Sequence, residues 1–223
     1  MDMNANLPTF LGAFLGLLAT AAADSIAIDW YGGGKNEGAS QSRMARSEWA
    51  GAVPQQHWNS FTGPKQPAGQ PLVDRNGAAT GATVTWKAGG MWDTNGADKP
   101  GDFRMMLGYL SNGAEEIAVT VTGIPAQFIA TGYDVYVYSD GDNDTHRRAA
   151  TFAIGAVSAV NTDMSSASFA GKFVEGLNYV CLRGLTEATF TLTATPVVGP
   201  KTNNPRAPIN GIQIVQRSAA GKP

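Results

Sequence analysis

The sequence TFTLTAT at residues 189–195 places threonine at every odd position and an apolar residue at every even one. A period of two is expected of a strand that packs one face on a core and leaves the other in water. Residues 117–122 (IAVTVT) keep the same alternation. The two segments predict an antiparallel β-domain.

Segments with this character recur along the chain and predict a series of short strands. Besides 189–195, these are residues 25–30, 71–74, 82–87, 116–122, 133–138, 150–154, 168–174, 178–182 and 209–215. Their close spacing favours an all-β fold, an antiparallel β-sandwich or jelly roll.

Three segments between these strands are predicted to be something else. Residues 61–71 are rich in glycine and proline, which predicts irregular structure, and residues 88–101 predict a polar loop. Residues 102–110 (DFRMMLGYL) predict one or two helical turns, with Asp102 as the N-cap.

Composition sets limits on the class of protein. The 223 residues are enough for one β-domain, which we predict over residues 24–217, and the 27 glycines suit its many turns. A net charge of −2, with no Lys/Arg cluster, gives no electrostatic case for a nucleic-acid partner. The single cysteine, Cys181, cannot form an internal disulfide and is predicted to be a buried strand residue.

The first 23 residues are predicted to be a signal-like segment. Residues 10–23 (FLGAFLGLLATAAA) resemble the apolar region and small-residue cleavage site of a secretory signal, and they are too short to predict a membrane span. Residues 1–9 contain Asp2 and no Lys or Arg, which leaves open a short hydrophobic helix retained in the mature protein. We expect the protein to be secreted or at the cell surface, and residues 218–223 to be frayed.

Several segments carry a resemblance to a known family. They include YDVYVYSD at 133–140, NYV at 178–180, residues 190–196 and the closing RAPINGIQIV at 206–215. The last of these is similar to the final strand of galactose-binding-like jelly rolls, and the likeness as a whole is to exported bacterial β-sandwich domains. The resemblance covers about residues 25–216 and implies a carbohydrate-binding module. Such modules usually stand beside a catalytic domain, which this sequence does not show.

An acidic loop, SDGDND at 139–144, follows one of the predicted strands. Asp140, Asp142 and Asp144 stand at alternate positions and could donate oxygen ligands to Ca²⁺, the one cofactor that the sequence suggests. The spacing is not that of an EF-hand. A plain polar turn, ion pairs with the following arginines and direct contact with a ligand are the alternatives.

Aromatic and polar side chains near predicted loops are the candidate ligand contacts. Trp92 lies in the predicted polar loop and Trp49 in an irregular segment, so each is a candidate to stack on a sugar ring. Asp93, Asn143 and Arg147 are the candidate polar contacts. The other three tryptophans are predicted to be packing residues.

The sequence therefore favours an extracellular, non-catalytic module that recognises a polysaccharide or glycan. The second interpretation is a self-assembling surface or matrix subunit, which would form a homo-oligomer. A glycan-active hydrolase is the third: the chain has enough carboxylates, but no spacing singles out a catalytic pair and no Gly-x-Ser-x-Gly elbow is present.

Overall fold

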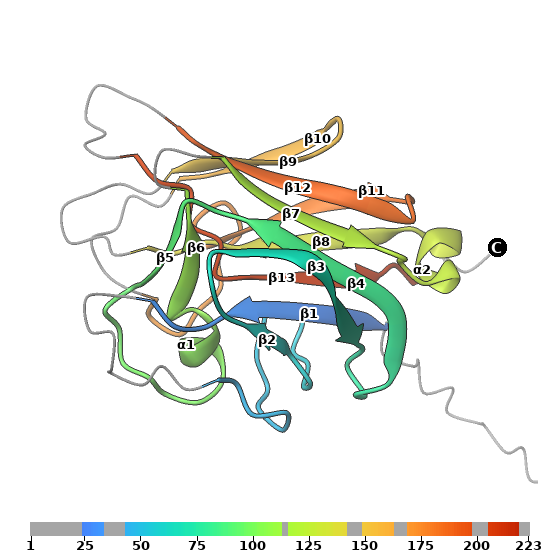
Figure 1. Cartoon of the computed structure of the whole chain (residues 1–223), viewed down its shortest axis with the longest axis horizontal. Helices are drawn as coiled ribbons and strands as arrows, with labels where there is room; N and C mark the ends of the chain where they lie inside the picture. The colour runs from blue at the N-terminus through green and yellow to red at the C-terminus, as the bar shows by residue number, and fades with distance from the viewer. Residues whose placement is uncertain are drawn as a thin grey trace, which may run out of the picture.

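The fold is an all-β sandwich of two main sheets, with two short helices at its ends (Figure 1). The computed structural model describes residues 24–33, 43–112, 116–141, 149–162, 169–197 and 205–218. The predicted signal-like segment and the last five residues of the predicted tail lie outside these ranges. None of the helices in the described ranges is long and apolar enough to cross a bilayer.

The first sheet has five strands in the order β11–β8–β13–β1–β2. Its bounds are β1 Ser25–Trp30, β2 Asn59–Phe61, β8 Tyr133–Tyr138, β11 Tyr179–Leu185 and β13 Gly211–Gln216. All its pairings are antiparallel except the parallel pairing of β1 with β2.

The second sheet has six strands in the order β10–β9–β12–β7–β4–β3 and is fully antiparallel. Its bounds are β3 Lys65–Val73, β4 Ala79–Lys87, β7 Ile117–Thr122, β9 Ala150–Ile154, β10 Val157–Asn161 and β12 Thr189–Pro196. A separate hairpin joins β5 Gly90–Asp93 to β6 Gly108–Ser111. The helices are α1 Asp102–Met105 and α2 Ala126–Thr131.

The alternating apolar and polar residues of the sequence lie on opposite faces of the six-stranded sheet. In β12, Phe190, Leu192 and Ala194 are buried in the core between the sheets, and the threonines face outward. Thr191 on this outer face lies opposite Thr120 of β7, and their hydroxyls are 2.9 Å apart. The predicted antiparallel sandwich is confirmed.

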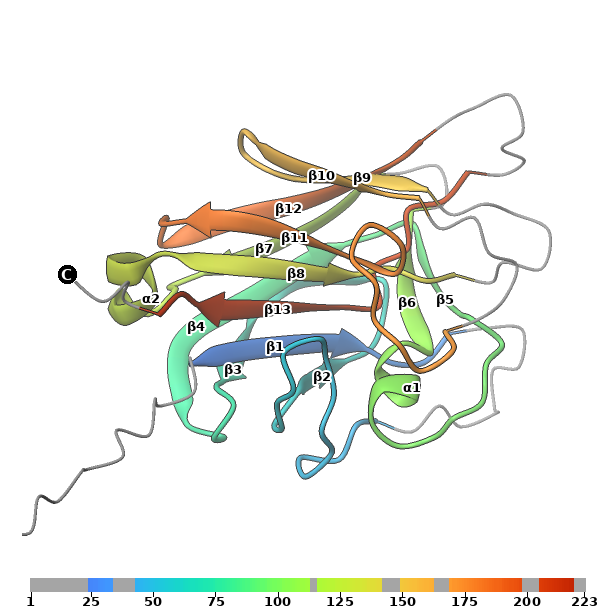
Figure 2. The ribbon, with the colours of Figure 1, turned by 180° about the vertical axis from the view of Figure 1, so that it is seen from behind.

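The five-stranded sheet, in contrast, is buried on both faces along its strands β1 and β13. Ile26 and Ile28 of β1 face the core between the sheets, whereas Ala27 contacts a second apolar cluster on the outer face. That cluster is closed by Met44, Ala50 and Trp58 from the covering loop, by which we mean residues 43–58, and by Met105, Met106 and Phe169. Figure 2 shows the covering loop and α1 near one end of this sheet.

Two predicted irregular regions are strands instead. β3 runs through residues predicted to be irregular, because it is an edge strand, where Pro67 and Pro71 are tolerated, and register shifts accommodate them. β5 lies in the predicted polar loop, because its backbone pairs with β6.

Other local predictions were also wrong. Residues 169–174 are not a strand; Phe169 and Phe173 pack against the second apolar cluster instead. The helix at 102–110 ends at Met105, and its N-cap is Gly101, because the Asp102 carboxylate accepts the Gly51 N–H at 2.8 Å. Helix α2 and strand β10 were not predicted.

Candidate functional site

The covering loop is held against the sheet beneath it by buried polar side chains. Gln213 of β13 donates from Nε2 to the carbonyl of Val53 at 2.7 Å, and its Oε1 accepts the Tyr138 hydroxyl. The same hydroxyl accepts the Ala52 N–H at 2.7 Å. Burial raises the pKa of Tyr138 well above its usual value, so the phenol stays protonated and donates to Gln213. These contacts fix the loop's backbone on the sheet.

Trp49 is the most exposed large apolar side chain of the described residues. It is 56% exposed, while Trp30, Trp58 and Trp86 are all buried, as predicted for packing residues. The backbone beside it is fixed, because Ala50 and Gln55 exchange both N–H···O bonds at 3.1 Å. Trp49 therefore presents an open indole on an ordered support.

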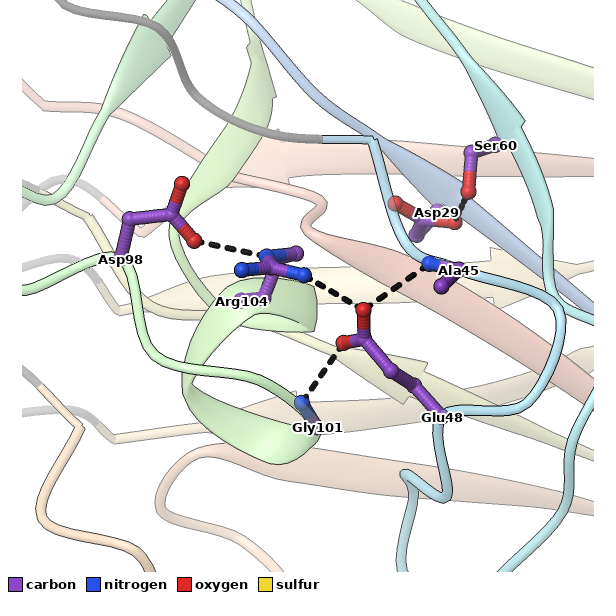
Figure 3. A network of polar contacts seen from close by, with 7 residues as sticks. All are labelled: Asp29, Ala45, Glu48, Ser60, Asp98, Gly101 and Arg104. Carbon is purple, nitrogen blue, oxygen red and sulfur yellow. Dashed lines mark hydrogen bonds and ion pairs between the residues drawn. The ribbon is translucent and has the colours of Figure 1, made fainter.

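A charged network holds the part of the covering loop that precedes Trp49 (Figure 3). Glu48 accepts N–H bonds from Ala45 at 2.9 Å and from Gly101 at 2.8 Å, and it forms an ion pair with Arg104 of α1. Arg104 also donates from Nε to Asp98 at 2.7 Å. Hydrogen bonding to Asp98, together with the charge of Glu48, raises the pKa of Arg104. Glu48, the residue before Trp49, is thus bonded to the start of α1.

A buried carboxyl group lies near this network, on β1. Asp29 is 1% exposed and accepts a hydrogen bond from the Ser60 hydroxyl of β2. Burial raises the pKa of Asp29 to about 7; the Ser60 bond and the charge of Arg43 act in the opposite direction. The group is therefore closed off from solvent.

Trp92 and Asp93, the first predicted contacts, lie on β5. Trp92 is half-buried, and its indole Nε1 is buried with no hydrogen-bond partner among the residues described. Asp93 accepts the Asn95 N–H at 2.9 Å in a local turn. Trp92 is therefore less open to a ligand than Trp49.

Asp140, the first residue of the predicted calcium loop, is 2% exposed. Its carboxylate accepts the Phe169 N–H at 2.7 Å, and its own N–H donates to Asn210 at 2.7 Å. Asn210 also donates to the carbonyl of Gly108, which is the register partner of Asp93. The structure therefore brings Asp140 and the β5–β6 hairpin to the same end of the sandwich.

The rest of the predicted site lies outside the described residues. This holds for Asp142, Asn143, Asp144 and Arg147. Within the described ranges, no group of three or more His, Cys, Asp or Glu side chains is placed to hold a metal ion.

The sequence did not predict the residues that organise this site. Glu48 and Arg104 are 56 positions apart, and Gly51 and Asp102 are 51 apart, so no local pattern pairs them. The arrangement offers one exposed aromatic face, that of Trp49, on a backbone that hydrogen bonds and an ion pair hold in place. Such a face packs on the C–H side of a sugar ring, or on another flat apolar surface.

Comparison with protein-family models, with curated proteins and with solved structures found no match.

Proposed function

We propose that the chain is a non-catalytic carbohydrate-recognition module in which the ligand stacks on Trp49. The observation that carries the proposal is the exposed indole between two fixed points, the Glu48 network and the Ala50–Gln55 pairing. An indole that is already ordered loses little conformational freedom when a ligand binds. The sequence resemblance to galactose-binding-like jelly rolls supports the same class of ligand, and the composition of residues 10–23 supports a location outside the cell.

The test is affinity electrophoresis of the full chain on a panel of polysaccharides. Trp49→Ala removes the stacking face and is expected to cost about 2 kcal/mol, roughly thirtyfold in affinity. Trp49→Tyr keeps an aromatic face and should restore most of the binding. Val197→Ala, at another exposed apolar residue, is the matched control and should bind like the wild type.

The same panel is repeated with Ca²⁺ and with a chelator. Loss of binding on chelation would support calcium in the Asp140–Asp144 loop, and unchanged binding would remove calcium from the proposal. Absence of binding to every polysaccharide overturns the recognition role. Equal binding by Trp49→Ala overturns the site but leaves the role in place.

A further inference from the structure

One side of the sandwich ends in two neighbouring strand edges. β10 is the last strand of the six-stranded sheet and β11 is the last strand of the five-stranded sheet. The two lie close together, and residues just beyond β10 are bonded to the segment before β11: Thr162 donates its N–H to Gly176 at 2.8 Å. Figure 1 shows β10 at the margin of the molecule. Among the described residues, no strand pairs with the outer side of β10.

An apolar patch lies at this side of the molecule. Of the five exposed large apolar side chains in the described part of the chain, all except Trp49 belong to it. We call this group the edge patch; it consists of Val160, Val174, Leu177 and Val197.

Hydrogen bonds place these four residues near one another. Asn161, the residue after Val160, donates to the carbonyl of Leu177 at 3.4 Å. Leu177 donates its N–H to Val174 at 3.1 Å, and Val197 donates to Ala149, next to the residue that pairs with Asn161. These bonds bring the chain at the four exposed apolar residues to the same margin of the molecule, where an association would cover them.

The strand at this edge lacks the features that usually prevent edge pairing. Residues 157–161 read VSAVN, with no charge and no proline. The other edges of the two main sheets differ: β3 carries Lys65 and two prolines, β2 has three residues, and β11 has a register irregularity and carries Arg183. Of the edges of the two main sheets, β10 is therefore the one most open to a further strand.

Charge indicates which partner fits this edge. In a two-fold pairing, β10 of one copy lies beside β10 of the other copy. A charged edge would therefore bring like charges together. β10 carries no charged residue, and neither do the four side chains of the edge patch, which makes the edge compatible with itself. Val157 and Ala159 pack toward the core, so Ser158 and Val160 remain on the outer face beside the new strand.

We propose that a second copy of this chain pairs antiparallel with β10 and joins the two six-stranded sheets into one. This association is independent of carbohydrate binding. It covers the edge patch, and it gives the backbone N–H and C=O groups on the outer side of β10 partners in the copy.

Sedimentation velocity of the full chain over a range of concentrations tests the proposal. We expect the mass to rise from 23.3 kDa toward twice that value as the concentration increases. Val160→Lys should weaken the dimer by at least about tenfold, because it places like charges across the pairing. Ala68→Lys adds the same charge to the β3 edge and should leave the dimer unchanged.

Two further measurements guard against misreading the variant. If Val160→Lys lowers the unfolding temperature, Ser158→Lys, at another exposed position, takes its place. Amide hydrogen exchange in residues 157–161 should slow as the dimer forms. A wild type that stays monomeric, or a dimer that persists in Val160→Lys and in Ser158→Lys with unchanged exchange in β10, overturns the proposal.

Discussion

The hydroxyl of Ser60 on β2 donates a hydrogen bond to the carboxyl group of Asp29 on the neighbouring strand β1, and both side chains are buried. The two residues are register partners of the parallel β1–β2 pairing. A carboxyl group without solvent is disfavoured in its charged form, and burial is the main cause of its raised pKa of about 7.

Asp29→Asn should stabilise the protein at alkaline pH. The folded-state pKa is above the usual value of 3.8, so the folded state holds the proton more tightly than the unfolded state. The Asp29 contribution to stability is therefore full below about pH 4, is lost as pH rises to about 7, and is constant above that. At about 1.4 kcal/mol for each pKa unit, the loss at high pH is on the order of 4 kcal/mol.

Urea unfolding of the wild type and Asp29→Asn across this pH range measures the difference. Asparagine keeps the acceptor for Ser60 and has no charge, so the variant's advantage should grow between about pH 4 and 7. Ser60→Ala removes the hydrogen bond that lowers the Asp29 pKa. In this variant the free energy of unfolding should therefore fall further between low and high pH than it does in the wild type. If the difference in free energy of unfolding between the wild type and Asp29→Asn does not change with pH, the raised pKa of Asp29 is contradicted.

Local periodicity was enough to predict several strands but not the site. The bounds of β1, β8 and β9 agree with prediction, because apolar residues and neighbouring turns are local signals. Asp29 could not be predicted as buried, because a carboxylate usually faces water and no local pattern shows that Ser60 of the neighbouring strand lies against it.

The two candidate tryptophans show the same limit. The glycine- and aspartate-rich segment around Trp92 predicts an exposed loop, but pairing of β5 with β6 half-buries this side chain. The exposure of Trp49 depends on contacts of the covering loop with Asp102 and Tyr138, which are far from it in sequence. Tertiary contacts of this kind leave no periodic signal.

Glu48→Ala should loosen the covering loop. The side chains of Glu48 and Arg104 are only 11% and 15% exposed, and removing the carboxylate also leaves the Ala45 and Gly101 N–H groups without their acceptor. The expected loss in free energy of unfolding is about 2–3 kcal/mol.

The matched control for Glu48→Ala is Glu175→Ala, which breaks the exposed ion pair with Arg183. Water screens that pair, so its loss should cost less than about 1 kcal/mol in the same urea titration. Equal costs for the two variants would show that the Glu48 network does not stabilise the loop.

Cys181 should resist alkylation in the folded protein. The side chain lies on β11 and is buried, and burial raises the pKa of its thiol to about 11. Because the thiolate is the reactive form, a thiol reagent at neutral pH should react slowly with the native chain and rapidly in urea. Fast reaction without denaturant would indicate that the β11 edge opens readily.

Gly51→Ala tests how closely the covering loop approaches the sheet. Gly51 has a φ of 100°, and a Cβ there would come within 2.6 Å of Gln213 Oε1 and 3.0 Å of the Trp58 ring. Gln213 cannot move aside without losing its bonds to Val53 and Tyr138, and Trp58 belongs to the second apolar cluster. The substitution therefore combines backbone strain with overpacking.

Gly63→Ala is the matched control, because Gly63 has a φ of 88° and a Cβ there would meet no atom within 4 Å. It should cost only the backbone strain, about 1–2 kcal/mol. Gly51→Ala should cost a further 1–3 kcal/mol, roughly the usual penalty for forcing a methyl group into a packed site. Urea unfolding of both variants gives the difference directly, and equal costs would mean that the loop can lift off the sheet, in which case Trp49 would not stand on a fixed support.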